Sequence, residues 1–562
     1  MSRTEYELQR EANIARNRAL LEELHLKEAV KALGIPAKKA SPAPGEKKAK
    51  PVQPAKRKRA ADDEPVLRRQ STRLRRTAPD PDETPAQKRA REREEEKARQ
   101  KAEEDRLAAE EAAREATKPR HDDLDLETLI RGEGLDDTQI SSTRTYFQSI
   151  AETPIPKRLP RQDAYVFDEE KEEKGEVKAL RARMEGLKVV ARAKVTTDRI
   201  YSAAYHPEPS KDLVFFGDKH GQLGIWDARA EAHNGNDDDD DDDDRPVDER
   251  EGGKYWRLQP HWPATSKSSI SSIKFDPFDS STVYTSAYDC TVRALSFESG
   301  VSRELFHLQG TLINCLDVVP GTREMWLSDA SGGVTHLDLR EDTQKTSRWY
   351  QLSDQKIGSI SVNPTNPAFL LTASNTRLMK VWDARKLSAI PAADDSLDFD
   401  ADRISEYSKS KAGKAVQRGE FQHGKSVSSA YWDPRGRSIV STSYDDTLRL
   451  WDVNPSMMAK DAPFKDFKPA TRIKHNCQTG RWLTVLKAQW SANPDVYPHF
   501  TVGNMDHSVN VYSAKGELLA KLADSTKITA VQAVTCSHPS VVERIATGNG
   551  SGRCVLWAPA DD

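Results

Sequence analysis

Cysteine is scarce in this sequence, and no long apolar run occurs in its 562 residues. The five cysteines are odd in number and form no C-x-x-C pair, which argues against both a disulfide framework and a cysteine zinc cluster. A membrane-spanning helix needs roughly 18 apolar residues in a row, and no such run is present. Because the N-terminus is charged rather than apolar, we expect a protein that is neither secreted nor membrane-bound.

Hydrophobic residues are also few, at 36% of the chain, and the mean hydropathy is −0.77. The deficit lies in the first 186 residues, whose long charged runs and few aromatic residues are typical of disorder. The sequence predicts four segments there: a helix over 1–35, a basic disordered linker over 36–86, a charged single helix over 87–117 and an irregular linker over 118–186.

The net charge of −3 conceals two strongly charged segments. Residues 36–76 hold 14 Lys and Arg against 4 Asp and Glu, whereas 237–244 are eight consecutive aspartates. The basic segment is either a solvated tail or a segment for nuclear import or phosphate contact. The aspartate run resembles a cation- or histone-binding tract, but a solvated, self-repelling loop is the better interpretation.

A repeated pattern fills the rest of the chain. Each copy has a turn with proline, a hydrophobic strand, a small polar turn, and a strand that ends in Trp or a substitute for it. That Trp position recurs at Trp226, Leu295, Leu337, Trp382, Trp451, Tyr512 and Trp557. Successive positions lie 42 to 69 residues apart, which is the ~40–45-residue WD-repeat period with some insertions. The pattern predicts an all-β fold, a seven-bladed WD-repeat β-propeller.

The predicted propeller covers 187–562, with an acidic loop at 231–251 and insertions at 386–424 and 454–480. The last repeat ends near the C-terminus without room for a fourth strand. Residues 187–195 have strand character, so we expect them to supply that strand and close the ring, which protects sheet edges.

No enzyme signature is present in the sequence, and we expect no catalytic residue, bound metal or cofactor. The stretch Gly548-Asn-Gly-Ser-Gly552 resembles a phosphate-binding loop, but it lacks the Lys-Ser/Thr pair and the helix that such a loop requires. It lies where the seventh repeat turns from its second to its third strand, so we interpret it as structural.

Three arginines form one candidate partner-binding set. Trp226-Asp-Ala-Arg229 is repeated as Trp382-Asp-Ala-Arg385 and, more weakly, as Leu337-Asp-Leu-Arg340. Each arginine follows a third strand, on the rim that also carries the proline turns. Arginine is a frequent anchor at protein interfaces, so the set favours docking of a protein partner.

A basic loop forms the second candidate site. Residues 465–482 hold five Lys and Arg against one Asp, and they join blades five and six on the face opposite the three arginines. A loop with cations for phosphates and an aromatic wedge is what insertion into a distorted duplex requires. The candidate DNA-binding residues are Arg472, Lys474, His475, Asn476, Arg481 and Trp482. The alternative is that Trp482 only packs between blades.

The blade order, the W-D-x-R pair and the stretch His475-Asn-Cys-Gln-Thr-Gly-Arg-Trp-Leu-Thr484 resemble the fungal DNA damage-binding WD-repeat family. That family is related to animal WD-repeat protein 76 and to the small subunit of the UV-damaged-DNA-binding complex. The resemblance implies a nuclear protein that binds DNA, preferentially UV-damaged DNA. It also implies docking onto a cullin ubiquitin-ligase adaptor through Arg229 and Arg385, with chromatin proteins as further candidate partners.

One departure from the UV-damage subunit concerns its Phe-Gln-His hairpin before blade six. This chain has Phe421-Gln-His423 before blade five instead, and Gly480-Arg481-Trp482 before blade six. We therefore expect Arg481 and Trp482 to act as the wedge, and we interpret Phe421-Gln-His423 as structural.

These features favour a non-enzymatic nuclear DNA-binding propeller that prefers damaged or distorted duplex. The rival hypothesis is a protein-interaction scaffold or cullin substrate receptor in which the propeller does not touch DNA.

Overall fold

A computed structural model describes residues 118–130, 136–153, 158–231, 252–392 and 396–560. The predicted helices over 1–35 and 87–117, the basic linker over 36–86 and the aspartate run lie outside the described residues. Those four predictions stay predictions. No helix in the described ranges combines the length and apolar composition needed to cross a membrane.

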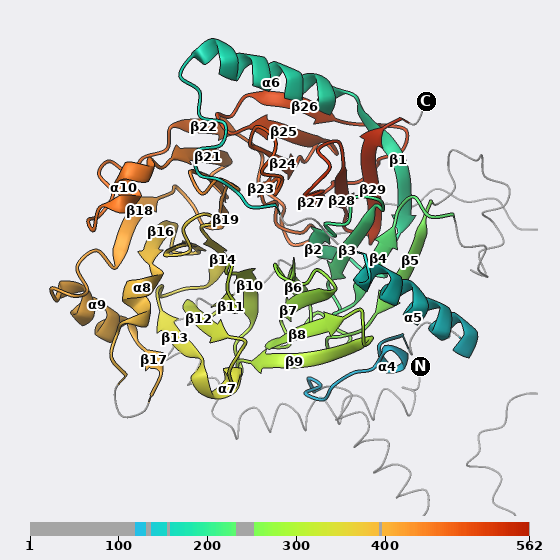
Figure 1. The fold of residues 1–562 in the computed structure, drawn as a ribbon, viewed down its shortest axis with the longest axis horizontal. Coiled ribbons are helices and arrows are strands. Elements are labelled where there is room, and N and C mark those ends of the chain that lie inside the picture. The colour runs from blue at the N-terminus through green and yellow to red at the C-terminus, as the bar shows by residue number, and fades with distance from the viewer. Residues whose placement is uncertain (1–117, 131–135, 154–157, 232–251, 393–395, 561–562) are drawn as a thin grey trace, which may run out of the picture. The chain divides into compact units, whose positions relative to one another are not determined.

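Seven sheets of four or five strands surround a central axis, as the repeat predicted (Figure 1). The first three blades, each written from its inner to its outer strand, are as follows. Blade one contains β2 (Ile200–Tyr205), β3 (Leu213–Asp218), β4 (Leu223–Asp227) and β5 (Lys254–Leu258). Blade two contains β6 (Ile270–Phe275), β7 (Thr282–Ala287), β8 (Thr291–Ser296) and β9 (Val301–His307). Blade three contains β10 (Ile313–Val318), β11 (Glu324–Asp329), β12 (Gly333–Asp338), β13 (Arg348–Gln351) and a fifth strand β17 (Asp398–Phe399).

The next three blades follow the same order. Blade four contains β14 (Ile357–Val362), β15 (Phe369–Ser374), β16 (Leu378–Asp383) and β18 (Gln417–Gln422). Blade five contains β19 (Val427–Trp432), β20 (Ser438–Ser443), β21 (Thr447–Asp452) and β22 (Thr471–Lys474). Blade six contains β23 (Gln489–Trp490), β24 (His499–Gly503), β25 (Val509–Ser513) and β26 (Leu518–Leu522).

Blade seven joins the two ends of the propeller. Its inner strands are β27 (Val534–Ser537), β28 (Ile545–Gly548) and β29 (Arg553–Pro559), and its outer strand is β1 (Leu187–Lys194). The antiparallel register runs from Leu187 opposite Pro559 to Lys194 opposite Arg553. The predicted closure by residues 187–195 is therefore confirmed, since this first strand completes the last blade and covers the outer edge of β29.

All seven residues of the repeated Trp position lie on third strands and are buried. Their hydrogen bonding differs from blade to blade. In blade five the indole Nε1 of Trp451 has no hydrogen-bond partner among the described residues. In blade two, by contrast, Leu295 replaces Trp, and yet His261 bonds Asp289 at 2.9 Å and Thr285 at 2.9 Å. In blade two the histidine network therefore forms without the Trp.

The range 118–186 is not the irregular linker that the sequence predicted, because it contains three helices. These are α4 (Leu126–Ile130), α5 (Asp137–Ala151) and α6 (Glu170–Glu185). Helix α5 begins with a capping box and buries Phe147 against Trp256 and Phe297. Helix α6 lies along β26 on the outside of blade six, where it buries Val177, Leu180 and Met184 (Figure 1).

These three buried residues of α6 recur at helical spacing, but they stand among many charged residues, which hid the apolar face. The insertions at 386–424 and 454–480 are also shorter than predicted, since each contains the outer strand of a blade, β18 or β22. Their remaining elements are α8 (Ala384–Ser388), α9 (Ala401–Lys409) and α10 (Pro455–Ala459), and α7 (Thr343–Thr346) precedes β13.

Candidate nucleic-acid interface

The order of strands in each blade gives the propeller two different faces. We call the face with the second-to-third-strand turns and the blade-to-blade connections the connection face; it includes 444–446, 475–488 and 549–552. We call the other face, with the first-to-second-strand turns such as 206–212 and 433–437, the proline-turn face. The basic loop follows the fourth strand of blade five, whereas the three W-D-x-R arginines follow third strands. Third and fourth strands run in opposite directions, so the loop and the arginines lie on opposite faces.

The loop 475–488 is held at both ends by hydrogen bonds to other blades. Toward blade five, the Cys477 backbone N–H donates to Asp446 Oδ1 at 3.0 Å, and Gln478 Nε2 donates to the Tyr444 carbonyl at 2.7 Å. Toward blade one, Arg199 Nη1 donates to the Arg481 carbonyl at 3.0 Å, and Thr484 donates to the Ile200 carbonyl. The loop thus bridges the connection face from blade five to blade one.

Trp482 is at the tip of this bridge with its side chain in solvent. It is 87% exposed, the highest value among the exposed large hydrophobic residues of the described chain. Gly480 adopts a φ of +62°, a conformation that glycine tolerates without strain and that lets the chain turn just before the tip. The alternative in which Trp482 packs between blades is therefore wrong for this conformation. The indole is thus accessible to a ligand, on a loop whose backbone is held at both ends.

The other predicted DNA-binding residues are divided between surface and interior. Arg472 and Lys474 are exposed on β22, at the outer edge of blade five, and Asn476 is exposed just beyond it. His475 is buried, and its Nε2 is 2.9 Å from the Gly503 carbonyl oxygen. Burial lowers the pKa of His475, so the ring is a neutral structural group rather than a surface cation.

Phe421-Gln-His423 is a structural feature, as the sequence analysis proposed. The ring centroid of Phe421 is 5.3 Å from that of Trp451 and 5.1 Å from that of His423. His423 is buried, and its Nε2 is 3.4 Å from the hydroxyl of Ser441. The side chains of Phe421 and His423 are therefore committed to packing between blades four and five.

The structure also shows a cationic and aromatic cluster that sequence reasoning missed. Arg199 donates to the Tyr201 hydroxyl at 3.1 Å, and the rings of Tyr201 and Tyr288 are 6.3 Å apart. Lys356 Nζ is 3.4 Å from the Tyr288 hydroxyl, and burial lowers the pKa of this lysine. Burial raises the pKa of Tyr288, and the charge of nearby Lys487 opposes that rise.

Arg199, Lys356 and Lys487 share one structural position. Each lies in a blade-to-blade connection, one or two residues before the inner strand of its blade. Because inner strands line the axis, these connections bring the three cations to the end of the central channel on the connection face. In the sequence, these residues are recognisable only as cations just before first strands. The arrangement of the blades in a ring is what places them at the same end of the channel.

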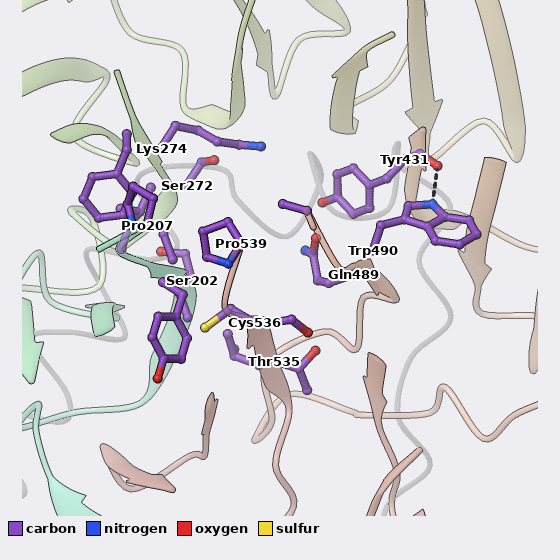
Figure 2. Close-up of a pocket in the computed structure, with 18 of the residues that line it drawn as sticks. Ser202, Pro207, Ser272, Lys274, Tyr431, Gln489, Trp490, Thr535, Cys536 and Pro539 are labelled. Atoms are coloured by element: carbon purple, nitrogen blue, oxygen red, sulfur yellow. Dashed lines mark hydrogen bonds between the residues drawn. The ribbon is translucent and has the colours of Figure 1, made fainter. Parts of the chain in front are cut away.

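The channel beneath this cluster is a cavity of about 520 Å³. Inner-strand residues of several blades line it, among them Ser202, Ser272, Tyr431 and Thr535 (Figure 2). Tyr201 and Lys487 lie on its lining, which also reaches the proline turns Pro207 and Pro539 at the other end. The cavity therefore connects the cationic cluster with the interior of the propeller.

The two candidate sites differ in ion pairing: the arginines of the predicted partner-binding set are paired with aspartates, whereas several cations near the basic loop have no carboxylate partner among the described residues. On the proline-turn face, Arg229 pairs with Asp212 at 2.8 Å, Arg385 with Asp383 at 2.8 Å, and Arg435 with Asp433 at 2.8 Å. On the connection face, among the residues that the structure describes, no ion pair involves five of the cations. These are Arg199, Lys356, Lys425, Arg481 and Lys487. Cations without carboxylate partners are available to neutralise the phosphates of a nucleic acid.

The W-D-x-R arginines lie beside the proline turns, because the backbone after each third strand bonds to the first-to-second-strand turn. Ala228 N–H donates to the Asp212 carbonyl at 2.9 Å, and Ala384 N–H to the Ala368 carbonyl at 2.8 Å. Each arginine is paired with an aspartate, yet Arg340 and Arg385 remain more than half exposed. Helix α5 lies close to the motif that contains Arg229, since Tyr146 donates to Oδ2 of Asp227 at 2.5 Å.

Comparison with known proteins agrees with this geometry. Residues 416–452 match the family described as WD domain, G-beta repeat. They run from the outer strand of blade four through the third strand of blade five.

Three relatives are DNA damage-binding proteins CMR1 of fungi. The protein of Cryptococcus neoformans is 38% identical over 496 residues, which cover 79% of this chain and 82% of the relative. That of Mycosarcoma maydis is 31% identical over 99% of both chains. That of Aspergillus clavatus is 33% identical over 99% of this chain and 98% of the relative. The resemblance seen in the sequence is confirmed, and this chain belongs to the DNA damage-binding protein CMR1 family.

Proposed function

We propose that this protein is a nuclear, non-enzymatic DNA-binding propeller that prefers UV-damaged or otherwise distorted duplex. The observation that carries the proposal is Trp482, an 87% exposed indole on a loop that hydrogen bonds hold at both ends. The names of the fungal relatives support DNA damage binding as the general activity.

The connection face supplies the two kinds of contact that such binding needs. Arg481 and the cluster of Arg199, Lys356 and Lys487 contact backbone phosphates on either side of the indole. Trp482 inserts at a base step that damage has already weakened. Because an intact step costs a few kcal/mol more to unstack, the wedge selects deformable sites without reading base edges.

The proposal is tested by fluorescence anisotropy on the full chain with matched intact and UV-irradiated duplexes across a salt series. Tighter binding to the irradiated duplex at every salt concentration is the expected result. Equal affinity for both duplexes would contradict the proposed preference, and absence of binding to either would contradict DNA binding altogether.

Neutralising the cationic cluster should weaken binding to both duplexes alike. We expect the double variant Lys356→Gln/Lys487→Gln to reduce the slope of log K against log salt by about 2, one for each lost phosphate contact. The ratio between damaged and intact duplex should stay unchanged, because phosphate contacts carry no sequence or damage information. The matched control is Arg340→Gln on the proline-turn face, which should leave the salt slope as it is. An unchanged slope in the double variant would remove these lysines from the interface.

A second proposal concerns protein contacts on the proline-turn face, where Arg229, Arg340 and Arg385 act as docking residues for a protein partner. Its supporting observation is that aspartates hold these side chains at the surface in defined orientations. A cullin ubiquitin-ligase adaptor is the partner that the family resemblance implies, and chromatin proteins are further candidates.

The double variant Arg229→Ala/Arg385→Ala should lose at least about tenfold in affinity for the adaptor, as expected for interface arginines worth more than 1 kcal/mol. Its DNA affinity should stay unchanged, because the two sites are on opposite faces. Surface plasmon resonance with the purified adaptor and anisotropy with DNA measure the two effects separately. Normal adaptor binding by the double variant would refute the docking role.

A further inference from the structure

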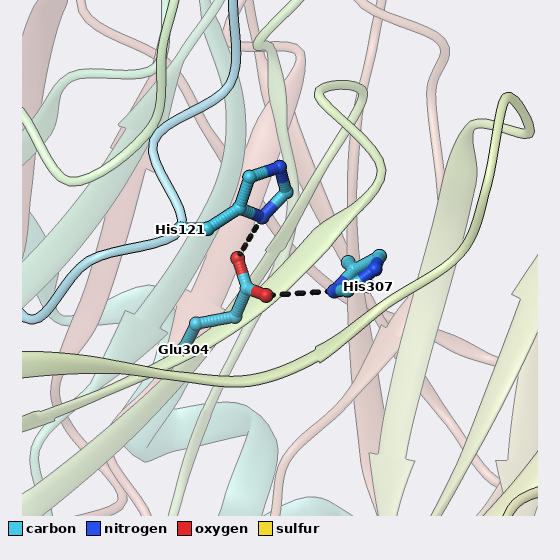
Figure 3. Close-up of side chains that lie close together, drawn as sticks. All are labelled: His121, Glu304 and His307. Carbon is cyan, nitrogen blue, oxygen red and sulfur yellow. Dashed lines mark hydrogen bonds and ion pairs between the residues drawn. The ribbon is translucent and has the colours of Figure 1, made fainter. Parts of the chain in front are cut away.

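Two histidines and one glutamate converge at the outer edge of blade two, away from both sites described above (Figure 3). His121 Nδ1 is 2.8 Å from Glu304 Oε2, and His307 Nδ1 is 2.8 Å from Glu304 Oε1. The two imidazole rings are 4.9 Å apart between centroids. One carboxylate therefore faces two imidazole nitrogens, one on each of its oxygens.

A strand irregularity brings two of the three side chains together. Residues three apart on a regular strand point to opposite sides of the sheet. In β9, however, Phe306 is opposite Val292 and Glu304 is opposite Arg293, so Leu305 is an extra residue without a partner. This bulge turns Glu304 and His307 to the same side, and bulges that re-aim a side chain often accompany functional sites.

The third residue arrives on a segment 183 residues earlier in the chain. Residues 118–124, which we call the strap, pair with β9 through two hydrogen bonds between Leu124 and Ser302, at 2.9 and 2.8 Å. The buried guanidinium of Arg293 donates to the carbonyls of Arg120 at 2.9 Å and Asp122 at 2.6 Å. The backbone on both sides of His121 is thus fixed, and the imidazole is held over Glu304.

We propose that His121, Glu304 and His307 bind one divalent transition-metal ion, for which Zn²⁺ is the best match, and that the ion fastens the strap to blade two. All ligand atoms lie within 4.8 Å of one another. A tetrahedral Zn²⁺ with bonds of about 2.0–2.2 Å separates its ligands by roughly 3.4 Å, so small side-chain rotations suffice. Two imidazoles and one carboxylate are a ligand set that zinc uses in proteins, with water in the fourth position.

The exposure of the three groups suits entry of an ion from solution. The side chains of His121, His307 and Glu304 are 54%, 33% and 12% exposed, so the carboxylate is nearly covered and the imidazoles can admit the ion. The site is independent of DNA binding, because it is on β9 at the edge of the sheet. Its role is structural: metal binding holds residues 118–124 against blade two.

The test titrates the metal-free full chain with Co²⁺ and follows the visible absorption of the ion. Tetrahedral Co²⁺ with nitrogen ligands absorbs strongly, whereas Co²⁺ on the carboxylates of the aspartate run is octahedral and absorbs weakly. We expect one equivalent of strong absorption that Zn²⁺ abolishes, and a Tm that rises by a few degrees in Zn²⁺ because the ion binds only the folded protein.

Three variants decide the outcome. His121→Ala and Glu304→Gln should each abolish the strong absorption and the Tm increase, and His121 is exposed enough for its loss to be tolerated by the fold. The matched control is His220→Ala, since His220 faces a single carboxylate, Asp198, at 2.6 Å and should leave the signal intact. If the wild-type protein lacks the strong absorption, or if His121→Ala retains it, the three residues form only a hydrogen-bonded cluster and the proposal is wrong.

Discussion

Replacing Trp482 by Ala should reduce the preference for UV-irradiated over intact duplex by about tenfold or more, while affinity for intact duplex changes little. Stacking of a base on an aromatic side chain is worth about 1–3 kcal/mol, and each 1.4 kcal/mol is a factor of ten in affinity. The indole makes that contact only where a base step is already weakened, so its loss affects the damaged duplex selectively. Anisotropy with the full chain on both duplexes measures the ratio.

Because Trp482 is 87% exposed, its removal should leave the thermal stability unchanged, and the comparison is then between equally folded proteins. The control is Phe278→Ala, which removes an exposed aromatic side chain from the first turn of blade two on the proline-turn face. That variant should keep the full preference. A Trp482→Ala protein that still prefers damaged duplex as strongly as wild type would show that the indole is not the wedge.

The second large effect is on stability, and it concerns a buried ion pair in blade four. The side chain of Arg418 is 1% exposed, and its Nη1 is 3.3 Å from Oδ2 of Asp383, which is 0% exposed. The same guanidinium donates to the Met457 and Met458 carbonyls at 3.3 Å and packs over the ring of Phe369 at 5.0 Å. We expect Arg418→Ala to lower the free energy of unfolding by about 3–5 kcal/mol, since it leaves the buried carboxylate of Asp383 with only the more exposed Arg385 and also removes the donor to the two methionine carbonyls.

Urea unfolding followed by tryptophan fluorescence measures this loss, and two variants separate its causes. Arg418→Met keeps an apolar chain over Phe369 but removes the charge, so it should recover only the packing part. Arg385 contacts the same carboxylate at 2.8 Å but is 68% exposed, and Arg385→Ala should cost under about 1 kcal/mol. A loss in Arg418→Ala no larger than in Arg385→Ala would show that the buried pair is not a major stabilising contact.

The sequence by itself determined the number of blades, the position of every third strand and the closure of the ring by residues 187–195. These features depend on contacts that repeat. Each blade packs against its neighbours in the same way, so the same pattern of apolar and turn residues recurs along the chain. The opposite placement of the basic loop and the W-D-x-R arginines was also predictable, because the direction of each strand determines which face its ends occupy.

The tertiary structure alone decided which candidate residues reach the surface. His475 and Trp482 belong to one basic stretch, yet the first is buried against Gly503 and the second extends into solvent. Nothing in their spacing distinguishes them, because burial depends on which turn of a neighbouring blade lies beneath each residue. In the same way, the sequence pattern did not predict α6, because its apolar face is narrow and becomes buried only against blade six.

The cationic cluster and the histidine–glutamate site could not be predicted from the sequence, for one common reason. Arg199, Lys356 and Lys487 belong to three different blades, and His121 is 183 residues away from Glu304. Each residue on its own is an ordinary surface side chain. Only closure of the ring brings the three cations to the same end of the central channel, and only pairing of the strap with β9 brings His121 within 2.8 Å of Glu304.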